Sequence, residues 1–318
     1  MANILITGIT GFSGSHLADL LVNTDNNIFG TIRGRCRQTD FIDHIKDKLT
    51  LLECDLNDFN SVIQTIEDAQ PDIIYHLAAQ SFVPTSWRAP QETLNTNVIG
   101  TLNMLESVRK TKFDPKILIA GSSEEYGLVL PDEVPIKETN PLRPISPYAV
   151  SKVAQDFLGY QYQQSYGMKI IRTRSFNIIG PRSGEKIVTA NFAKQIADIE
   201  KGKKDPIMYV GNLEASRDFN DVRDVVRAYT LAVEKCDYSD VYNIATGNDF
   251  KIQSVLDSLL KMTDKKIDIK QDPKRMRPSD VMILKGDSTK FRNKTGWRPE
   301  YTFEQSLKDV LDYWRTAD

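Results

Sequence analysis

The chain has 318 residues, which is long for one domain and short for two large ones, so a layered domain with a smaller lobe is expected. Hydrophobic residues make up 40% and charged residues 26%, ordinary values for a globular protein that buries a sizeable core. The net charge of −2 gives no electrostatic basis for binding nucleic acid or an anionic membrane surface, so neither partner is expected.

The first half of the chain alternates short apolar runs with amphipathic stretches. The apolar runs predict strands at Ile4–Thr7, Asn27–Ile32, Leu49–Cys54, Ile73–His76, Lys116–Ala120 and Lys169–Thr173. The amphipathic stretches predict helices at Phe12–Val22, Asn57–Glu67, Gln91–Arg109 and Tyr148–Tyr166. This alternation implies right-handed crossovers and a doubly wound parallel sheet, so the predicted fold class is α/β.

Beyond about residue 176 the pattern becomes less regular. Helices are predicted at Val188–Gly202 and Ile252–Lys261, and Asp221–Val233 has the spacing of a helix that returns to the first domain. Segments rich in proline, glycine and charge predict loops at Ile178–Lys186, Gly202–Pro206 and Gln271–Pro278. We therefore expect a smaller, interleaved C-terminal lobe that binds substrate over a cleft. The expected domains are 1–176 with about 219–247, and 177–218 with 248–318.

Cysteine and histidine usage excludes further classes. Neither residue type shows the spacing of a disulfide framework or a metal site; the residues are Cys36, Cys54, Cys236, His16, His44 and His76. No apolar stretch reaches the roughly 18 residues of a membrane span, and no basic leader precedes Ile4. The expectation is a cytoplasmic protein that binds no metal.

A glycine-rich segment follows the first predicted strand and opens the first predicted helix; it reads Gly8-Ile9-Thr10-Gly11-Phe12-Ser13-Gly14. Glycines at such a turn let the backbone approach a pyrophosphate, which the N–H groups and dipole of the helix then stabilise. Any tight turn between a strand and a helix also favours glycine. The strand–turn–helix context indicates a Rossmann-type dinucleotide site.

The end of the second strand indicates which dinucleotide binds. An NAD site places Asp or Glu there for the ribose 2′-hydroxyl, whereas a 2′-phosphate favours cations. This chain has Arg33, Arg35 and Arg37, with no carboxylate before Asp40. Guanidinium groups pair well with phosphate, so NADP is predicted; the alternative is a solvated surface turn.

Tyr148 and Lys152 lie four residues apart, on one face of a helix that Ser146 and Pro147 would cap. A tyrosine with a pKa near 10 is a poor base at neutral pH. The Lys152 ammonium and an oxidised nicotinamide would both favour the phenolate, so a lowered pKa is expected for Tyr148. A tyrosine followed four residues later by a lysine is common by chance. It indicates a catalytic pair here because the chain also has the glycine-rich nucleotide loop and Ser122.

A polar cluster, residues 121–127, follows the strand Lys116–Ala120, at the edge where parallel sheets bind ligands. Ser122 could hydrogen-bond a substrate oxygen that is oxidised or reduced, and Glu124 could move a proton at an adjacent carbon. The alternative for Glu124 and Glu125 is a solvated loop pair, which is the interpretation we favour for Glu125.

These segments resemble the extended short-chain dehydrogenases/reductases, and most of all the group of GDP-mannose 4,6-dehydratases and GDP-4-keto-6-deoxy-mannose reductases. The general resemblance lies in the glycine turn, Leu77-Ala78-Ala79-Gln80-Ser81, Ser122, and Tyr148 with Lys152. The closer resemblance lies in residues 121–127 and 146–152, Gly211-Asn212-Leu213, Arg217-Asp218, Arg277-Pro278-Ser279 and Gly296-Trp297. It runs nearly from end to end.

The resemblance implies three sets of site residues. The catalytic set is Ser122, Glu124, Tyr148 and Lys152. The NADP set is Gly8, Thr10, Gly11, Phe12, Ser13, Gly14, Arg33, Arg35, Asp55, Leu56, Leu77, Ala78, Ala79, Ser81, Tyr148 and Lys152. The set for the GDP-sugar is Ser86, Asn177, Asn191, Gly211, Asn212, Arg217 and Arg277. Two arginines also suit a diphosphate on their own chemistry. Surface ion pairs of Arg217 with Asp218, and of Arg277 with Asp280, are the alternative.

Two activities compete, and the dehydratase is the leading one. The first is a GDP-mannose 4,6-dehydratase, a lyase that uses NADP internally and needs the Glu124 carboxylate. The second is a reductase that uses external NADPH on the 4-keto product and needs no such acid. Ile178, where many relatives carry histidine, and the short chain favour the reductase. Another nucleotide-sugar epimerase or dehydratase, or a non-catalytic NADP-binding protein, is less favoured. A homodimer through paired helices is expected.

Overall fold

The computed structural model describes residues 1–34, 39–275 and 281–317. Within these residues, seven parallel strands form one sheet in the order β10-β6-β5-β4-β1-β2-β3. Their bounds are β1 (Asn3–Thr7), β2 (Asn27–Ile32), β3 (Leu49–Glu53), β4 (Ile73–His76), β5 (Lys116–Ser122), β6 (Ile170–Ser175) and β10 (Val241–Ile244). The six strands predicted for the first half are all present, and the α/β class is confirmed.

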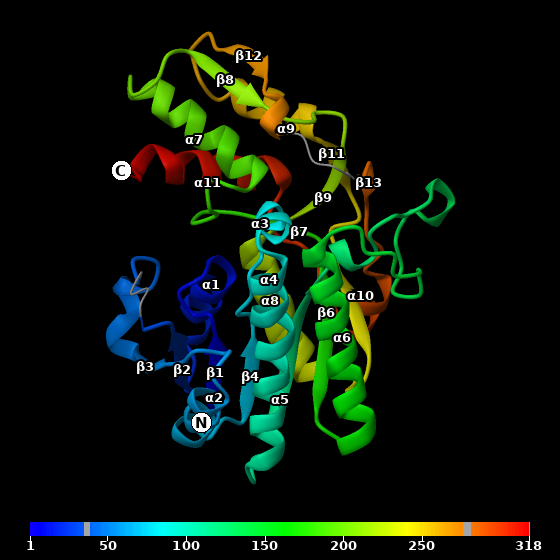
Figure 1. Cartoon of the computed structure of the whole chain (residues 1–318). Helices are drawn as coiled ribbons and strands as arrows, with labels where there is room; N and C mark the ends of the chain where they lie inside the picture. Colours follow the sequence, from blue (N-terminus) through cyan, green and yellow to red (C-terminus); the bar gives the residue numbers. More distant parts are fainter. Residues whose placement is uncertain (35–38, 276–280, 318) are drawn as a thin grey trace.

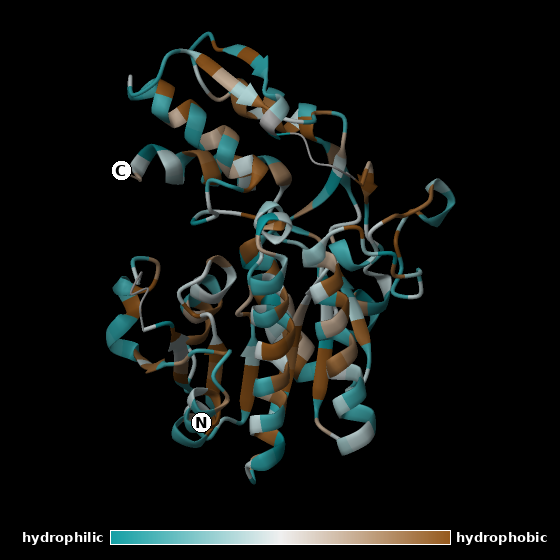
Figure 2. Ribbon diagram, in the orientation of Figure 1, coloured by the Kyte–Doolittle hydropathy of each residue, from teal (hydrophilic) through white to brown (hydrophobic). Residues whose placement is uncertain are grey.

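Helices cover both faces of this sheet (Figure 1). Their bounds are α1 (Phe12–Leu21) and α8 (Val222–Lys235) on one face, and α2 (Phe59–Ala69), α5 (Gly100–Lys110) and α6 (Pro147–Tyr166) on the other. Successive residues of a strand point to opposite faces, so Ile4 and Ile6 pack with α1 and α8 while Leu5 packs with α2 and α5. Figure 2 shows the resulting hydrophobic strands between amphipathic helices.

The helix predicted as Gln91–Arg109 is divided into three segments: α4 (Pro90–Leu94), the π-helical turn η2 (Asn95–Ile99) and α5. A short helix that was not predicted, α3 (Val83–Arg88), precedes them. The buried Asn97 side chain bonds the Gln80 backbone and the Ser151 hydroxyl, which holds the wider turn in place. Hydrophobic spacing does not reveal such a change in backbone hydrogen bonding.

The C-terminal lobe has its own core, formed by three helices that bury side chains such as Ile196, Val255 and Val310. The helices are α7 (Val188–Glu200), α9 (Ile252–Leu260) and α11 (Phe303–Thr316). Two small sheets accompany them, made of β7 (Asn177–Ile179), β9 (Ser216–Asp221), β11 (Asp249–Lys251) and β13 (Ile283–Leu284), and of β8 (Ile207–Val210) and β12 (Asp268–Gln271). The sequence analysis did not predict these sheets; β9, for example, is mostly polar and has no apolar run.

The remaining described elements are short. They are α10 (Thr289–Thr295) and the short 3₁₀ turns η1 (Asp43–Lys48), η3 (Ser123–Glu125), η4 (Pro131–Glu133) and η5 (Pro273–Arg275). Phe291 on α10 and the nearby Trp297 pack into the core beneath the large sheet, although the expected boundaries assign both to the second lobe. In the described ranges, no helix is long and apolar enough to cross a membrane, and no cluster of His, Cys, Asp and Glu could hold a metal ion.

Candidate active site

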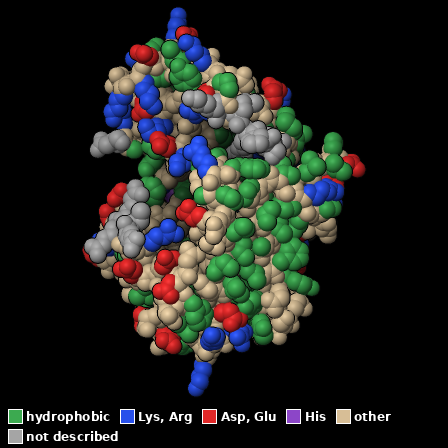
Figure 3. All heavy atoms as spheres, in the orientation of Figure 1, with side chains coloured by type: hydrophobic (Ala, Val, Ile, Leu, Met, Phe, Trp, Pro, Cys, Tyr) green, Lys and Arg blue, Asp and Glu red, His purple; other side chains and the backbone are tan. Residues whose placement is uncertain are grey.

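A cavity of about 1910 Å³ lies between the carboxyl edge of the large sheet and the C-terminal lobe; it opens as the deep notch in Figure 3. Its lining brings together the glycine turn after β1, the polar ends of β5 and α6, and residues of β7, α7 and β9. This is the edge of a parallel sheet where strand order reverses, between β1 and β4. The cavity therefore places a nucleotide-type turn beside the candidate catalytic residues.

The glycine turn is shaped for close approach by a ligand. Gly8 adopts a positive φ of 72°, and a Cβ atom on Gly14 would lie 2.2 Å from the Gly8 carbonyl oxygen. Gly11 is the N-cap of α1 and makes no side-chain cap. The first N–H groups of α1 are thus aimed at the cavity without a competing side chain, an arrangement that fits a pyrophosphate.

Most of the predicted NADP residues line this cavity; they are Gly8, Thr10, Gly11, Phe12, Ser13, Gly14, Arg33, Leu56, Leu77, Ala78, Ala79, Ser81 and Tyr148. Asp55 is not part of the lining, and its carboxylate accepts a hydrogen bond from the Asn57 N–H. Lys152 lies behind the wall. Arg35 is outside the described residues.

The end of β2 carries one cation and meets one carboxylate. Arg33 is exposed and lines the cavity. Glu53 lies at the end of the neighbouring strand β3, close to Gly34. A Cβ atom on Gly34 would lie 1.6 Å from the Glu53 carboxylate. The sequence analysis missed this carboxylate because it is 20 residues away along the chain. Glu53 itself is not among the residues that line the cavity.

Tyr148 lies at the first turn of α6, which the Ser146 hydroxyl caps by accepting a bond from Ala149 N–H (3.1 Å). Burial raises the pKa of Tyr148, a hydrogen bond with Ser122 opposes that shift, and the Glu124 carboxylate adds to it. The sequence analysis expected a lowered pKa. The protein's own groups act in the opposite direction, so Tyr148 is a neutral phenol.

Lys152 lies one turn further along α6 and is almost completely buried. Its ammonium donates to the Ala120 carbonyl (2.8 Å) and to Gln155 Oε1 (2.7 Å). Burial lowers the pKa of Lys152 to about 8, and the nearby Glu125 carboxyl opposes that shift. The lysine is therefore held by two neutral oxygens at the base of the site.

The two glutamates after Ser122 have different environments. Glu124 is partly exposed and lines the cavity. Glu125 is completely buried, and its carboxylate accepts from the Ser122 N–H (2.7 Å) and from Arg174 Nε (2.9 Å). The expectation that Glu125 is a solvated loop residue is wrong. Burial and the nearby Asp156 raise its pKa well above the usual value.

The predicted GDP-sugar residues are partly gathered on the opposite wall, where Asn177, Asn191, Gly211, Asn212 and Arg217 line the cavity. The Asn177 Oδ1 atom is buried and has no hydrogen-bond partner among the described residues. Ser86 does not line the cavity: it is fully buried, and its hydroxyl donates to the Val83 carbonyl (2.7 Å). Its neighbours Trp87 and Arg88 line the cavity instead. Arg277 is outside the described residues.

The alternative of an Arg217–Asp218 surface pair does not fit the structure, because both residues are buried. The Arg217 guanidinium donates to the Val281 carbonyl (2.6 Å). The Asp218 carboxylate accepts from Thr246, including its hydroxyl (2.7 Å), and from Gly247 N–H (2.9 Å). Arg217 is thereby anchored in the wall, and it reaches the cavity.

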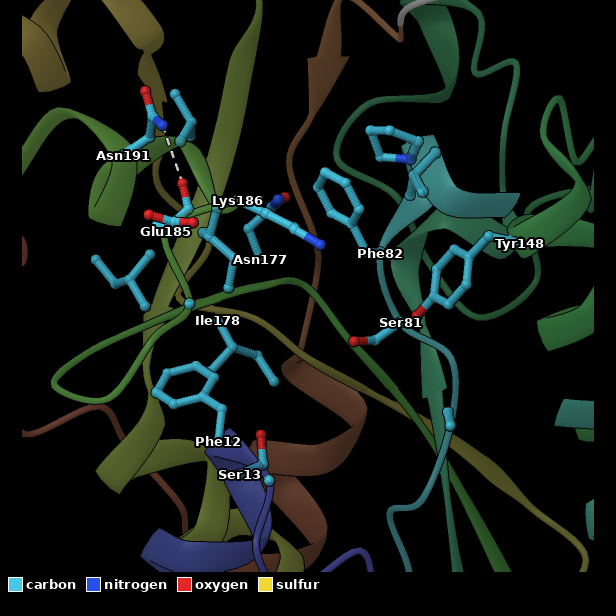
Figure 4. Close-up of a pocket in the computed structure, with 18 of the residues that line it drawn as sticks. Phe12, Ser13, Ser81, Phe82, Tyr148, Asn177, Ile178, Glu185, Lys186 and Asn191 are labelled. Atoms are coloured by element: carbon cyan, nitrogen blue, oxygen red, sulfur yellow. Dashed lines mark hydrogen bonds between the residues drawn. The ribbon is translucent and has the colours of Figure 1, made fainter. Parts of the chain in front are cut away.

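The lining also contains cations that the sequence analysis missed. Its Lys and Arg residues are Arg33, Arg88, Lys186, Lys194, Lys203, Lys204, Arg217 and Arg275, and its Asp and Glu residues are Glu124, Glu185 and Asp205. Figure 4 shows Lys186 reaching across toward Phe82, with its Nζ 5.2 Å from the ring centroid, and Asn191 bonded to the Glu185 carbonyl (2.9 Å). The excess of positive charge favours an anionic ligand.

The chain is similar to known proteins over nearly its whole length. A family model described as GDP-mannose 4,6 dehydratase matches residues 5–310. The chain is 33% identical over 314 residues to the GDP-6-deoxy-D-mannose reductase of Pseudomonas aeruginosa, covering 98% of this chain and 97% of the relative. It is also 33% identical over 350 residues to the GDP-mannose 4,6-dehydratase of Yersinia enterocolitica, covering 98% and 93%.

Solved structures resemble the fold over its whole length. RMD from Pseudomonas aeruginosa complexed with NADPH is 31% identical, with a TM-score of 0.86 and 99% of each chain covered. A UDP-glucose 4-epimerase from Thermotoga maritima, solved with UDP-glucose, is 30% identical, with a TM-score of 0.87 and 98% of each chain covered. The same architecture thus serves more than one reaction on nucleotide sugars.

Proposed function

This chain belongs to the GDP-mannose 4,6-dehydratase family of the extended short-chain dehydrogenases/reductases, and on that premise we propose that it reduces a GDP-4-keto-6-deoxy-mannose with NADPH. The observation that carries the proposal is the place of Tyr148, which lines the cavity at the first turn of α6 with Ser122 beside it; burial raises its pKa, so the phenol has a proton to donate. Reduction of a ketone needs a group that donates a proton to the oxygen, whereas oxidation of the hydroxyl needs a phenolate. NADPH has an uncharged nicotinamide, so the protein's own groups set the Tyr148 pKa.

The residues present fit the dinucleotide. The glycine turn and the N-terminus of α1 would hold the pyrophosphate, Arg33 the 2′-phosphate, and Leu77–Ser81 would lie along the rest of the cofactor. When bound, the dinucleotide supplies a hydride to the sugar C4 carbon. Tyr148 then donates its phenolic proton to the C4 oxygen, and Ser122 hydrogen-bonds the same oxygen. Arg217 would neutralise part of the substrate diphosphate.

Chain length distinguishes this chain from some dehydratases only, because the alignment with the GDP-mannose 4,6 dehydratase 2 of Arabidopsis thaliana extends over 324 residues. The alignments with the reductase and with the Yersinia dehydratase cover the same 98% of this chain, yet they extend over 314 and 350 residues. The dehydratase therefore has segments that this chain lacks. The sequence analysis placed the dehydratase first; we propose the reductase instead because the buried Tyr148 phenol suits proton donation to a ketone.

A GDP-mannose 4,6-dehydratase is the second candidate, and Glu124 is the observation that favours it. This carboxylate lines the cavity and is close enough to Tyr148 to raise its pKa. In that reaction Tyr148 takes the C4 hydroxyl proton as hydride leaves C4. Glu124 would move the C5 proton to the C6 hydroxyl, which leaves as water. The same hydride would return to C6 while the proton held by Tyr148 goes to C5, so NADP is not consumed.

Two substrates and one variant separate the candidates. We expect the wild type to consume one NADPH per molecule of GDP-4-keto-6-deoxy-mannose and to leave GDP-mannose unchanged. Glu124→Gln should alter the rate of reduction by less than about threefold, because the change keeps the size of the side chain and no C5 proton moves. Product masses report the fate of each substrate, and NADPH absorbance measures the rate of reduction in the wild type and in the variant. Loss of one water from GDP-mannose by the wild type, at a rate that falls about 10²–10⁴-fold in the variant, would establish the dehydratase.

The choice of NADP over NAD is a separate prediction. We expect NADPH to bind at least about tenfold tighter than NADH, a difference of about 1.4 kcal/mol, because Arg33 pairs with the 2′-phosphate and Glu53 opposes it only from outside the lining. Arg33→Ala should remove most of this difference, as measured by fluorescence titration. Equal affinities in the wild type would show that Arg33 does not bind the phosphate.

We also propose a homodimer that forms through α6 and the neighbouring α4–η2 segment. Leu94, Ile99, Val150 and Phe157 expose between 38% and 52% of their surface, and Figure 3 shows hydrophobic side chains gathered over this face. An exposed apolar face of this kind marks a contact surface, and twofold pairing is the commonest solution. Sedimentation should give the mass of two chains, and Phe157→Glu that of one. A monomeric wild type would contradict the proposal.

A further inference from the structure

Behind Lys152, a chain of buried side chains joins the lysine to the glycine turn. The Lys152 ammonium donates to Gln155 Oε1 (2.7 Å), and Gln155 Nε2 donates to the Thr101 hydroxyl (2.9 Å). The same hydroxyl contacts His76 Nε2 (2.9 Å), and His76 Nδ1 contacts the hydroxyl of Thr7 (3.0 Å). Gln155 and Thr101 are fully buried and His76 nearly so. None of these three residues lines the cavity.

The chemistry of the groups fixes the direction of every bond in this chain. An ammonium can only donate, so the amide oxygen of Gln155 faces Lys152 and its NH₂ faces Thr101. Thr101 uses its one proton on the Asn97 carbonyl (2.7 Å), so it accepts from Gln155 and from His76 Nε2. Burial lowers the pKa of His76 to about 3, so the ring is neutral and its one proton is on Nε2.

The far end of the chain is bonded to the cofactor edge. Because His76 Nδ1 carries no proton, the Thr7 hydroxyl donates to it. Thr7 in turn accepts from the N–H groups of Leu77 and Ala78, both at 3.1 Å. Thr7 precedes Gly8, and Leu77 and Ala78 line the cavity. The network thus fixes Lys152 relative to two segments of the candidate dinucleotide site.

The same bond directions argue against the conduction of protons away from Lys152. Two donors, Gln155 and His76, converge on the Thr101 hydroxyl, whose single proton is used elsewhere. A proton leaving Lys152 would have to pass through an amide and then into a hydroxyl that already accepts two bonds. The chain therefore holds the lysine in place and does not conduct protons from it.

We propose that Gln155 is a positioning residue for Lys152, and that Thr101 and His76 fix the orientation of its amide. The inference rests on the proposed function, in which Lys152 belongs to the catalytic set. Gln155 Oε1 stabilises the charged ammonium, which must stay in one place as the C4 oxygen changes its protonation. A fully bonded buried network of this kind specifies one geometry.

The titratable groups that face Lys152 come from three elements. Glu125 on η3 opposes the lowering of the lysine pKa, His76 on β4 is neutral, and Tyr148 lies on α6 itself. None of them replaces the amide oxygen of Gln155. Its removal is therefore expected to favour the uncharged amine.

The test compares Gln155→Met, which keeps the length of the side chain but removes its polar atoms, with Gln161→Met, an exposed control on the same helix. Lys152 is titrated by NMR of ¹³Cε-labelled lysine, and Lys152→Met identifies its signal. We expect the pKa of Lys152 to fall by about one pH unit in Gln155→Met and to stay constant in the control, as expected for one hydrogen bond to a charged group. The rate of reduction should fall about tenfold, with the sugar KM changed less than about threefold.

A second pair keeps the proposal testable if Gln155→Met does not fold. Thr101→Val removes the acceptor that orients the Gln155 amide and should lower the Lys152 pKa in the same direction, whereas Thr101→Ser should restore the wild-type value. A Lys152 titration that is unchanged in every folded Gln155 and Thr101 variant would overturn the inference, even if thermal stability falls. A wild type that turns over no GDP-sugar would refute the proposed function instead, and the titration would still report on Gln155.

Discussion

Tyr148→Phe is expected to reduce the rate of NADPH-dependent reduction by about 10²–10⁴-fold while NADPH binding stays within a few-fold of wild type. The phenylalanine fills the same buried space but has no proton to donate to the C4 oxygen. Burial lowers the pKa of Lys152 to about 8 and raises that of Tyr148, so the wild-type rate should stay constant up to neutral pH and fall near pH 8, where the lysine loses its proton before the phenol does. Single-turnover absorbance of NADPH measures the rate.

Tyr166→Phe is the matched control. Tyr166 ends the same helix and is 53% exposed, so loss of its hydroxyl should leave the rate unchanged. If Tyr148→Phe kept a rate near that of wild type, proton transfer by this residue would be excluded, and both candidate reactions would have to be abandoned.

Asp156→Asn is expected to lower the free energy of unfolding by about 3–5 kcal/mol at neutral pH, the cost typical of breaking a buried ion pair on one side. Asp156 is 2% exposed and pairs with Arg172 and with Arg174 Nε, which lies 2.8 Å away. Without its charge, Arg174 keeps Glu125 as a partner, whereas Arg172 loses the carboxylate that it pairs with. Urea unfolding at pH 7 measures the difference.

The pH dependence gives this prediction a sign. The two guanidinium groups hold the pKa of Asp156 below its usual value, so its contribution is present above the ordinary aspartate pKa and is lost as the pH falls through the lowered one. The difference between wild type and variant should therefore shrink only in acid. Asp114→Asn, which breaks the exposed pair with Lys169, should cost less than about 1 kcal/mol. Equal costs for the two variants would contradict the role of the buried cluster.

This cluster also explains how the catalytic elements are fixed. Glu125 follows Glu124 on η3, Asp156 lies one turn beyond Lys152 on α6, and Arg174 on β6 bonds both carboxyl groups. Variants of Asp156 should consequently disturb activity as well as stability. Gln155 accepts a hydrogen bond directly from the Lys152 ammonium, so its proposed test is a titration of Lys152.

The sequence by itself determined the features that depend on neighbouring residues along the chain. The six strands of the first half follow from predicted runs of four to six residues, as confirmed in the sheet. The start of α6 follows from Ser146 and Pro147, since a cap acts within one turn. The shape of the glycine turn follows likewise, because a positive φ at Gly8 is a local property.

Only the tertiary structure decided the features that depend on distant contacts. Glu124 and Glu125 are adjacent and chemically alike, yet one lines the cavity and the other is buried against Arg174, 49 residues away. The direction of the Tyr148 pKa shift follows from burial, which a helix spacing of four residues does not reveal. Ser86 was predicted to face the substrate, but it points into its own helix.

The cations of the cavity show the same division most clearly. The sequence analysis predicted loops around Lys186, Lys203 and Arg275. It assigned none of these three cations to a site. Folding of the C-terminal lobe brings them to one wall, opposite the glycine turn. Charge is carried by single residues, but the potential in a cavity is the sum over all residues that surround it, and that sum exists only after the chain has folded.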